Sequence, residues 1–136
     1  MTEKIKLYDD SKCTACRGCQ LACKQWNALT ASQTENRGTY HNPPSLAPNT
    51  FLLIHYQDYV DKDGNVKWLF RKEACMHCTD AACGTVCPSG ALHYNKETKT
   101  VGLDHEKCIG CKECVAACPF EIPRWDAKTD KVYKCD

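Results

Sequence analysis

The sequence contains no hydrophobic run long enough to cross a membrane. Its mean hydropathy is −0.54, and it has no stretch of ~20 consecutive apolar residues, the length that a transmembrane helix requires. The first residues, MTEKIKLYDDSKC, also lack the apolar central region of a secretory signal peptide. We therefore expect no membrane segment in this chain.

Large apolar side chains and concentrated charge are scarce as well. The 136 residues include three Phe, three Trp and two Met, and 18 Lys and Arg stand against 17 Asp and Glu. A chain of this length forms one domain or two very small ones, with little material for a conventional hydrophobic core. The near balance of charge argues against the concentrated positive field that nucleic-acid binding requires.

Cysteine is abundant instead. Thirteen cysteines make up about a tenth of the chain, a density typical of a disulfide scaffold or of metal centres. No secretory signal directs the chain to an oxidising compartment, and an odd number of cysteines would leave one thiol over. The cysteines also stand in tight groups rather than scattered along the chain, which favours metal centres.

Twelve of the cysteines form three groups of four. The members are Cys13, Cys16, Cys19 and Cys23 in the first group; Cys75, Cys78, Cys83 and Cys87 in the second; and Cys108, Cys111, Cys114 and Cys118 in the third. Groups one and three read C-x2-C-x2-C-x3-C, the bacterial-ferredoxin spacing for [4Fe–4S] ligation. Group two has two more residues before its third cysteine. Zinc sites, the alternative, usually take cysteines as two pairs separated by a dozen or more residues.

The fourth cysteine of each group predicts how two groups share two clusters. Three thiolates spaced two residues apart can surround one cubane only on an irregular loop. The fourth cysteine follows about one helical turn later, so it points away and ligates the other cluster of a pair. We expect one cluster on Cys75, Cys78, Cys83 and Cys118, and another on Cys108, Cys111, Cys114 and Cys87.

The first group has no such partner group within these residues. Cys13, Cys16 and Cys19 need a fourth ligand, Cys23 needs a cluster, and Cys135 stands alone next to the last residue. By the symmetry of the repeat, Cys135 opens a fourth group whose other members lie beyond residue 136, so we expect a fragment of a longer subunit. A three-cluster protein in which Cys135 closes the first cluster is the alternative.

The segments between the cysteines predict an α+β fold of ferredoxin-like units, each holding two [4Fe–4S] clusters, with short helices, short antiparallel hairpins and much irregular loop. Thr, Asn, Ser and Pro residues favour a loop, and Asp63-Gly64 is a hairpin signal. The expected elements are a strand at Ile5–Tyr8, a helix at Gln20–Leu29, a loop at Thr30–Thr50, and two hairpins, one pairing Phe51–Val60 with Val66–Lys72 and one pairing Ala91–Tyr94 with Thr100–Asp104.

Three parts follow from this pattern. Residues 75–118 form a complete two-cluster unit. Residues 30–74 form an insertion made of a loop and a β-hairpin. Residues 1–29 together with 119–136 form a second, incomplete ferredoxin-like half that holds the first and fourth groups.

Four stretches resemble a known family: CTACRGCQLACKQWN (Cys13–Asn27), YHNPP (Tyr40–Pro44), WLFRKEACMHC (Trp68–Cys78), and CIGCKECVAACPFEIPR with VYKC (Cys108–Cys135). They look like the iron–sulfur, or beta, subunit of respiratory formate dehydrogenases. Those proteins belong to the four-cluster subunits that partner molybdenum or tungsten bis-pterin oxidoreductases. The resemblance covers nearly the whole chain.

The resemblance implies a subunit that relays electrons and has no substrate site of its own. In the family, a pterin-containing catalytic subunit oxidises formate, and the clusters of the beta subunit carry the electrons to a cytochrome or another acceptor. Family members pair the first group with the fourth and the second with the third. All thirteen cysteines are then cluster ligands, and the chain holds two complete clusters and contributes to as many as four.

Alternatives remain open at this point. The chain could serve a dimethyl sulfoxide, polysulfide or nitrite relative of formate dehydrogenase, or be a free-standing soluble polyferredoxin. Family members without a signal can be exported with a signal-bearing partner, so its location is periplasmic or cytoplasmic. Other side chains beside the cysteine loops could tune or shield the clusters, or have ordinary charge-balancing and packing roles: Arg17, Lys24, His77, Lys112, Arg124, Trp26 and Trp125.

Overall fold

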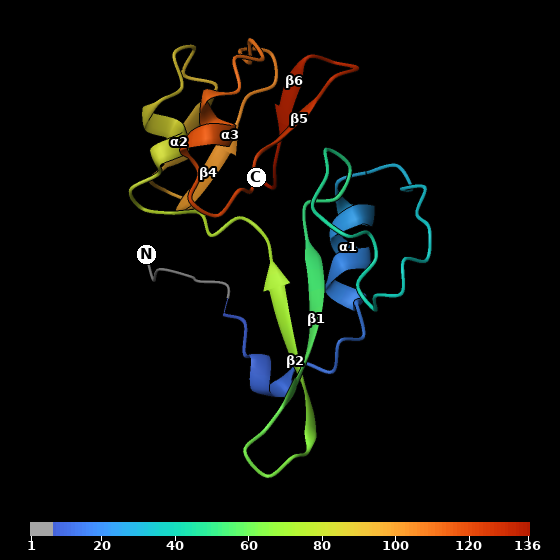
Figure 1. The fold of residues 1–136 in the computed structure, drawn as a ribbon. Coiled ribbons are helices and arrows are strands. Elements are labelled where there is room, and N and C mark those ends of the chain that lie inside the picture. The colour runs from blue at the N-terminus through green and yellow to red at the C-terminus, as the bar shows by residue number, and fades with distance from the viewer. Residues whose placement is uncertain (1–6) are drawn as a thin grey trace.

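The computed structural model of the protein describes residues 7–136. Within this range the chain forms short helices and three two-stranded antiparallel sheets, arranged in two lobes (Figure 1). In chain order the elements are η1 (Asp10–Lys12, a 3₁₀ turn), α1 (Gly18–Trp26), β1 (Leu53–Val60), β2 (Val66–Glu73), α2 (Ala82–Thr85), β3 (Leu92–Asn95), β4 (Thr100–Leu103), α3 (Glu113–Ala117), β5 (Arg124–Asp126) and β6 (Lys131–Tyr133).

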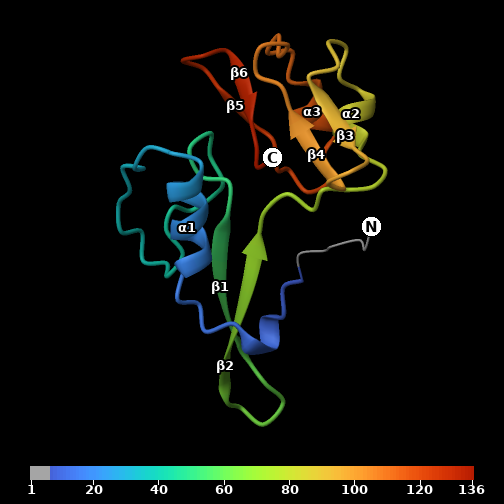
Figure 2. The ribbon, with the colours of Figure 1, turned by 180° about the vertical axis from the view of Figure 1, so that it is seen from behind.

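The first lobe is built on the long β1–β2 hairpin, with η1 and α1 beside it (Figures 1 and 2). The strands pair antiparallel from Leu53↔Glu73 to Val60↔Val66. Their turn is closed by Asp61, whose carboxylate Oδ1 accepts the N–H groups of Asp63 and Asn65 at 3.0 and 2.8 Å. Gly64 takes a φ of 81° in this turn, as the Asp-Gly signal predicts.

The second lobe contains α2, α3 and the small hairpins β3–β4 and β5–β6 (Figures 1 and 2). Buried residues of both hairpins, Leu92 and Val101 in β3–β4 and Val132 in β5–β6, pack with Cys114 in a shared core. The chain after Cys118 therefore lies against the lobe that carries cysteine groups two and three.

The buried interior of the described residues is divided into small clusters rather than joined in one core. One cluster packs α1 and its cysteine loop on the long hairpin through Ala15, Leu52, Ile54 and Ala74. A second is the core of the other lobe, and a third joins Leu46, Leu53 and Ile122. Cysteines pack on all three: Cys23 on the first, Cys83, Cys87 and Cys108 on the second, and Cys75 and Cys118 on the third.

The predicted mixture of short helices, antiparallel hairpins and irregular loop is confirmed. Both expected hairpins form, and residues 30–50 contain no helix or strand beyond the isolated bridge Ala47↔Thr50. The expected helix at Gln20–Leu29 begins earlier, at Gly18, and ends at Trp26, where the Asn27 side chain donates to the Cys23 carbonyl at 2.9 Å. The β5–β6 hairpin was not predicted.

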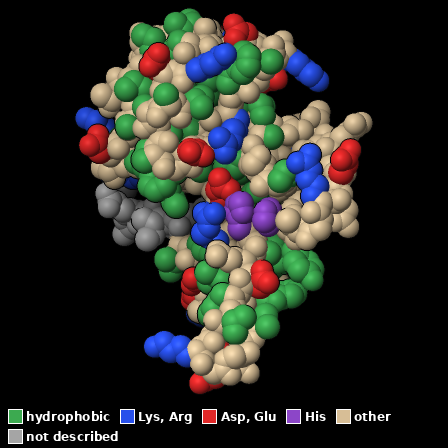
Figure 3. Space-filling view, in the orientation of Figure 1, with side chains coloured by type: hydrophobic (Ala, Val, Ile, Leu, Met, Phe, Trp, Pro, Cys, Tyr) green, Lys and Arg blue, Asp and Glu red, His purple; other side chains and the backbone are tan. Residues whose placement is uncertain are grey.

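The strand expected at Ile5–Tyr8 falls partly outside the described residues. Ile5 and Lys6 are not described, and Leu7 and Tyr8 belong to no strand. Of the helices in residues 7–136, none combines the length and the apolarity needed to span a membrane. Figure 3 shows Lys and Arg interspersed with Asp and Glu on the face in view, in keeping with the near balance of charge.

Candidate metal centres

The three cysteine loops share a backbone bend at equivalent positions. The residue two places after the first cysteine has a positive φ in every loop: 54° at Ala15, 49° at His77 and 71° at Gly110. This left-handed conformation costs about 1–2 kcal/mol for any residue other than glycine, so it persists only where the surroundings enforce it. The loops are irregular, as the cysteine spacing predicts, and the His77 N–H is turned toward Cys75 Sγ at 3.5 Å.

Four cysteines from groups two and three line one cavity of about 170 Å³. They are Cys75, Cys78, Cys83 and Cys118, the set that the spacing assigns to one cluster, and we call them site A. Apolar side chains such as Val101, Phe120 and Ile122 form much of the remaining wall. An all-sulfur donor set in an apolar enclosure suits an iron–sulfur cluster.

The remaining cysteines of these two groups also lie together, and we call them site B: Cys87, Cys108, Cys111 and Cys114. Burial, followed by the charges of Cys111, Cys87 and Cys108, raises the pKa of Cys114 to about 11. Burial opposes ionisation of Cys87 as well, but hydrogen bonds from the backbone and side chain around it lower its pKa overall. Site B therefore joins one cysteine of group two to three of group three.

The loop of group one is held against the β1–β2 hairpin by Tyr56. The Tyr56 hydroxyl donates to the Ala15 carbonyl at 2.6 Å and accepts from Arg17 Nε at 3.2 Å. The Arg17 guanidinium also lies 4.9 Å from the centre of the Tyr56 ring. Cys16 and Cys19 are exposed on this loop.

Cys135 lies beside group two and near the end of group one. Val101 N–H donates to His77 Nδ1 at 3.1 Å, so Nε2 carries the ring hydrogen and donates to Cys135 Sγ at 3.2 Å. A hydrogen bond with Cys135 lowers the pKa of Cys75 to about 5, against the effect of burial. The same bond, followed by burial, raises the pKa of Cys135, and Cys23 adds a smaller upward contribution.

Further facts bear on the alternatives of zinc and disulfides. None of the thirteen cysteines, all of which lie in the described range, forms a disulfide. In residues 7–136, no three His, Cys, Asp or Glu side chains converge closely enough to hold a single metal ion.

The four cations expected near the cysteine loops all have partners within the fold. Lys24 Nζ donates to the carbonyls of Thr30 and Asn49 at 2.8 and 2.6 Å and so fastens the 30–50 loop to α1. Lys112 Nζ lies 3.4 Å from the centre of the Trp125 ring, Arg124 Nε donates to the Leu46 carbonyl at 3.1 Å, and Arg17 binds Tyr56 as described. Each of these four side chains therefore stabilises the fold through a contact with another part of the chain.

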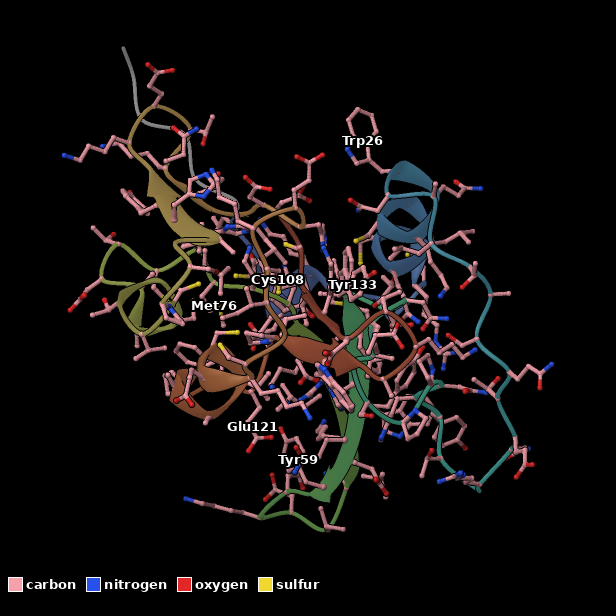
Figure 4. All side chains as sticks on the ribbon, turned by 90° about the horizontal axis from the view of Figure 1, so that it is seen from above. Trp26, Tyr59, Met76, Cys108, Glu121 and Tyr133 are labelled. Carbon is pink, nitrogen blue, oxygen red and sulfur yellow. The ribbon has the colours of Figure 1, made fainter. Side chains whose placement is uncertain are left out.

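The two tryptophans behave differently from each other. Trp26 is 91% exposed and points away from the end of α1 (Figure 4), so the expectation that it packs in a core or shields a cluster is wrong. Trp125 packs on the core of the second lobe, and its Nε1–H donates to Asp130 Oδ1 at 3.0 Å.

One residue at site A was missed from the sequence. Lys134 is 3% exposed and lines the site A cavity. A signal was present, because Lys134 stands two residues after the buried Val132, and alternate residues of an extended chain point to the same side.

These cysteine loops, short helices and antiparallel hairpins, with four cysteines lining one cavity, define a small ferredoxin-like fold. The chain belongs to the 4Fe-4S dicluster domain family: two family profiles of that description match, one over residues 66–136 and one over residues 12–91. It is thus an iron–sulfur protein that binds [4Fe–4S] clusters.

Several curated relatives align with almost the whole chain. It is 37% identical to the formate dehydrogenase-O iron-sulfur subunit of Escherichia coli, covering 98% of this chain and 44% of that protein. It is 40% identical to the formate dehydrogenase 2 subunit beta (cytochrome c-553) of Nitratidesulfovibrio vulgaris, covering 98% and 64%. Identity to one component of the anaerobic dimethyl sulfoxide reductase of Haemophilus influenzae is 34%, covering 95% and 58%. The chain spans about half the length of these relatives.

Proposed function

We propose that this chain relays electrons through [4Fe–4S] clusters within a formate dehydrogenase complex. The observation that carries the proposal is site A, where three cysteines of group two and one of group three surround a single cavity. Such crossed ligation holds two clusters in one lobe, close to each other. Closely spaced one-electron centres form a path for electrons.

In this proposal all thirteen cysteines are ligands. Sites A and B each hold one complete cluster in the unit formed by residues 75–118. Cys13, Cys16, Cys19, Cys23 and Cys135 belong to a second ferredoxin-like half that draws on residues 1–29 and 119–136, with residues 30–74 as an insertion. Of these residues, the β5–β6 hairpin packs in the core of the other lobe, so the two halves share this part of the chain. The influence of Cys23 on Cys135 supports a cluster to which both of these cysteines are ligands.

The relatives suggest the partners. The printed names of the relatives in E. coli and N. vulgaris are those of subunits of formate dehydrogenases. We therefore expect a catalytic subunit with a molybdenum or tungsten pterin centre on one side and a cytochrome or other redox protein on the other. Electrons would enter from the catalytic subunit, pass from cluster to cluster, and leave to the acceptor.

The ligand assignment is tested by exchanging single cysteines in the full protein, purified without oxygen. Cys78→Ser and Cys118→Ser should disturb the same cluster although they lie in different groups, whereas Cys87→Ser should disturb the other. Electron paramagnetic resonance of the reduced protein reads this out, together with iron and acid-labile sulfide, of which sites A and B account for about 8 each and four clusters for about 16 each. If Cys78→Ser and Cys87→Ser changed the same spectrum while Cys118→Ser changed another, the crossed arrangement would be refuted.

The function is tested in the native complex. Formate should reduce the clusters of the purified complex at least as fast as the complex turns over formate. A pterin-containing subunit should copurify. The relative in H. influenzae is named as part of a dimethyl sulfoxide reductase, which makes the opposite direction of electron flow the second candidate. In that case formate would leave the clusters oxidised, and dimethyl sulfoxide would oxidise clusters that had been reduced beforehand. Failure of both substrates, or negligible sulfide, would exclude both functions.

A further inference from the structure

A buried lysine lies against site A. Lys134 directly follows β6 and is 3% exposed, although lysine is among the residue types that are least often buried. Its side chain lines the same cavity as the four cysteines of site A. The charge of this ammonium group is therefore close to the site and shielded from water.

The ammonium group has hydrogen-bond acceptors but no anionic partner among the described side chains. Lys134 Nζ donates to the backbone carbonyls of Val101 and Cys135, and no carboxylate in residues 7–136 forms an ion pair with it. Asp80 also lines the cavity but is exposed, so water and salt weaken its field. A buried charge is costly unless an opposite charge compensates it. The cysteine sulfurs that line the same cavity are placed to supply this compensating charge.

The sulfurs of site A line the same cavity as this ammonium group. With a cluster bound, negative charge is spread over these sulfurs and the cluster, and it faces the ammonium group.

We propose that Lys134 tunes site A, raising the reduction potential of its cluster above that of the cluster in site B. An all-cysteine [4Fe–4S] centre changes its charge from roughly 2− to 3− when it takes up one electron from a neighbouring centre, and net charge and nearby charge set its potential. A fixed positive charge attracts the reduced form more strongly than the oxidised form. A unit charge that lines the same buried cavity as a cluster shifts the equilibrium between its oxidised and reduced forms by about tenfold or more.

The internal repeat supplies a comparison within the same lobe. Val101 in β4 and Val132 in β6 are equivalent, and each is 1% exposed. Two residues further on, the first repeat has Leu103 and the second has Lys134. Leu103 packs on the core that contains Cys114 of site B, so an apolar side chain takes the equivalent position near site B. The two clusters therefore differ in local charge although their ligands are the same.

The experiment is a redox titration followed by electron paramagnetic resonance, on the full protein in its native complex. Lys134→Met removes the charge and keeps most of the length. We expect its site A cluster to be about tenfold less reduced at a given potential, which is a fall of about 59 mV for a one-electron couple. The affected transition is assigned with Cys78→Ser. Lys134→Arg, which keeps the charge, should restore most of the potential of the site A cluster. The potential of the site B cluster should not change in either variant.

The matched control is Lys128→Met, the same exchange at an exposed lysine in the β5–β6 turn, which should move neither transition. If Lys134→Met retains its iron and both potentials stay unchanged, or if Lys134→Arg shifts site A as far as Lys134→Met does, the inference is wrong. If the methionine variant loses iron, Lys134→Gln replaces it. Iron loss from both neutral variants but not from Lys134→Arg would support the charge pairing, and loss from all three would overturn it.

This inference rests on the ligand assignment proposed above, and iron analysis separates the two. A parent protein without a cluster at site A would refute the ligand assignment. A cluster that is present in every variant and keeps one potential would refute only the role of Lys134.

Discussion

The loop of cysteine group three passes very close to the β5–β6 turn at Gly110. A Cβ atom at that position would stand 2.3 Å from the backbone oxygen of Asp130 and 3.0 Å from its Oδ1. The φ of Gly110 is 71°, which disfavours every residue with a Cβ. Gly110→Ala should therefore weaken both the loop that carries Cys108 and Cys111 and its contact with the hairpin.

The expected magnitude is the sum of two effects. The left-handed backbone costs an alanine about 1–2 kcal/mol relative to glycine. The close approach to Asp130 cannot be relieved by rotating a side chain, because the nearest atom is a backbone oxygen, so the chain must shift at a cost of about 1–3 kcal/mol. Together they predict a loss of about 2–5 kcal/mol, which lowers the midpoint of thermal unfolding by about 10 °C or more.

Two other glycines separate these effects. Gly90 has a φ of 65° and nothing within 4 Å of an added Cβ, so Gly90→Ala should cost about 1–2 kcal/mol from the backbone alone. Gly84 lies in α2, where an added Cβ meets ordinary contacts at 3.6 Å or more, so Gly84→Ala should be neutral or stabilising by up to about 1 kcal/mol.

The measurement is thermal unfolding of the three variants and the parent, without oxygen and at one scan rate, because loss of a cluster makes unfolding irreversible. Release of iron from site B to a chelator is followed in parallel and should be fastest in Gly110→Ala. If Gly110→Ala is no less stable than Gly90→Ala, the close contact between the loop and the hairpin does not exist, and the reasoning fails.

Three further substitutions test contacts outside the clusters. Tyr56→Phe removes the hydroxyl that donates to the Ala15 carbonyl at 2.6 Å, so stability should fall by about 1 kcal/mol, measured as above; an unchanged midpoint would contradict this. Lys24→Met releases the 30–50 loop, because its ammonium holds Thr30 and Asn49; limited proteolysis should cleave that loop several-fold faster, and equal rates would count against the contact. Trp125→Phe loses its donor hydrogen bond of 3.0 Å and should cost about 1 kcal/mol in the same unfolding assay, whereas no loss would show that the bond contributes nothing.

Local signals explain what could be predicted from the sequence. The cysteine spacing predicts which thiols share one cubane, and the predicted set of Cys75, Cys78, Cys83 and Cys118 lines one cavity. The Asp63-Gly64 turn and the NKETK turn each close a hairpin at the expected place. These features depend on residues a few positions apart, or on a repeat that is visible in the sequence.

The missed features are those for which residue type or turn sequence gives the wrong indication or none. The β5–β6 hairpin has strands of three residues and no Asn-Gly or Asp-Gly turn; the Asp126 carboxylate closes the turn by accepting from Lys128 N–H and Thr129 Oγ1 at 3.1 and 3.0 Å. Burial of Lys134 contradicts the ordinary preference of lysine for the surface, so residue type alone does not predict it. Aromatic residues usually lie inside, yet Trp26 lies at the exposed end of α1.

The division of the interior into small clusters has a consequence for how this protein folds and acquires its iron–sulfur clusters. Sulfur atoms of cysteine stand where leucine and phenylalanine side chains would fill the centre of an ordinary domain, and the aliphatic residues around them form patches too small to hold the lobes together alone. When ligands converge only in the folded chain, metal binding and folding draw on the same free energy. We therefore expect maturation and folding to be coupled in this protein, so that the supply of iron and sulfide governs how much newly made chain folds.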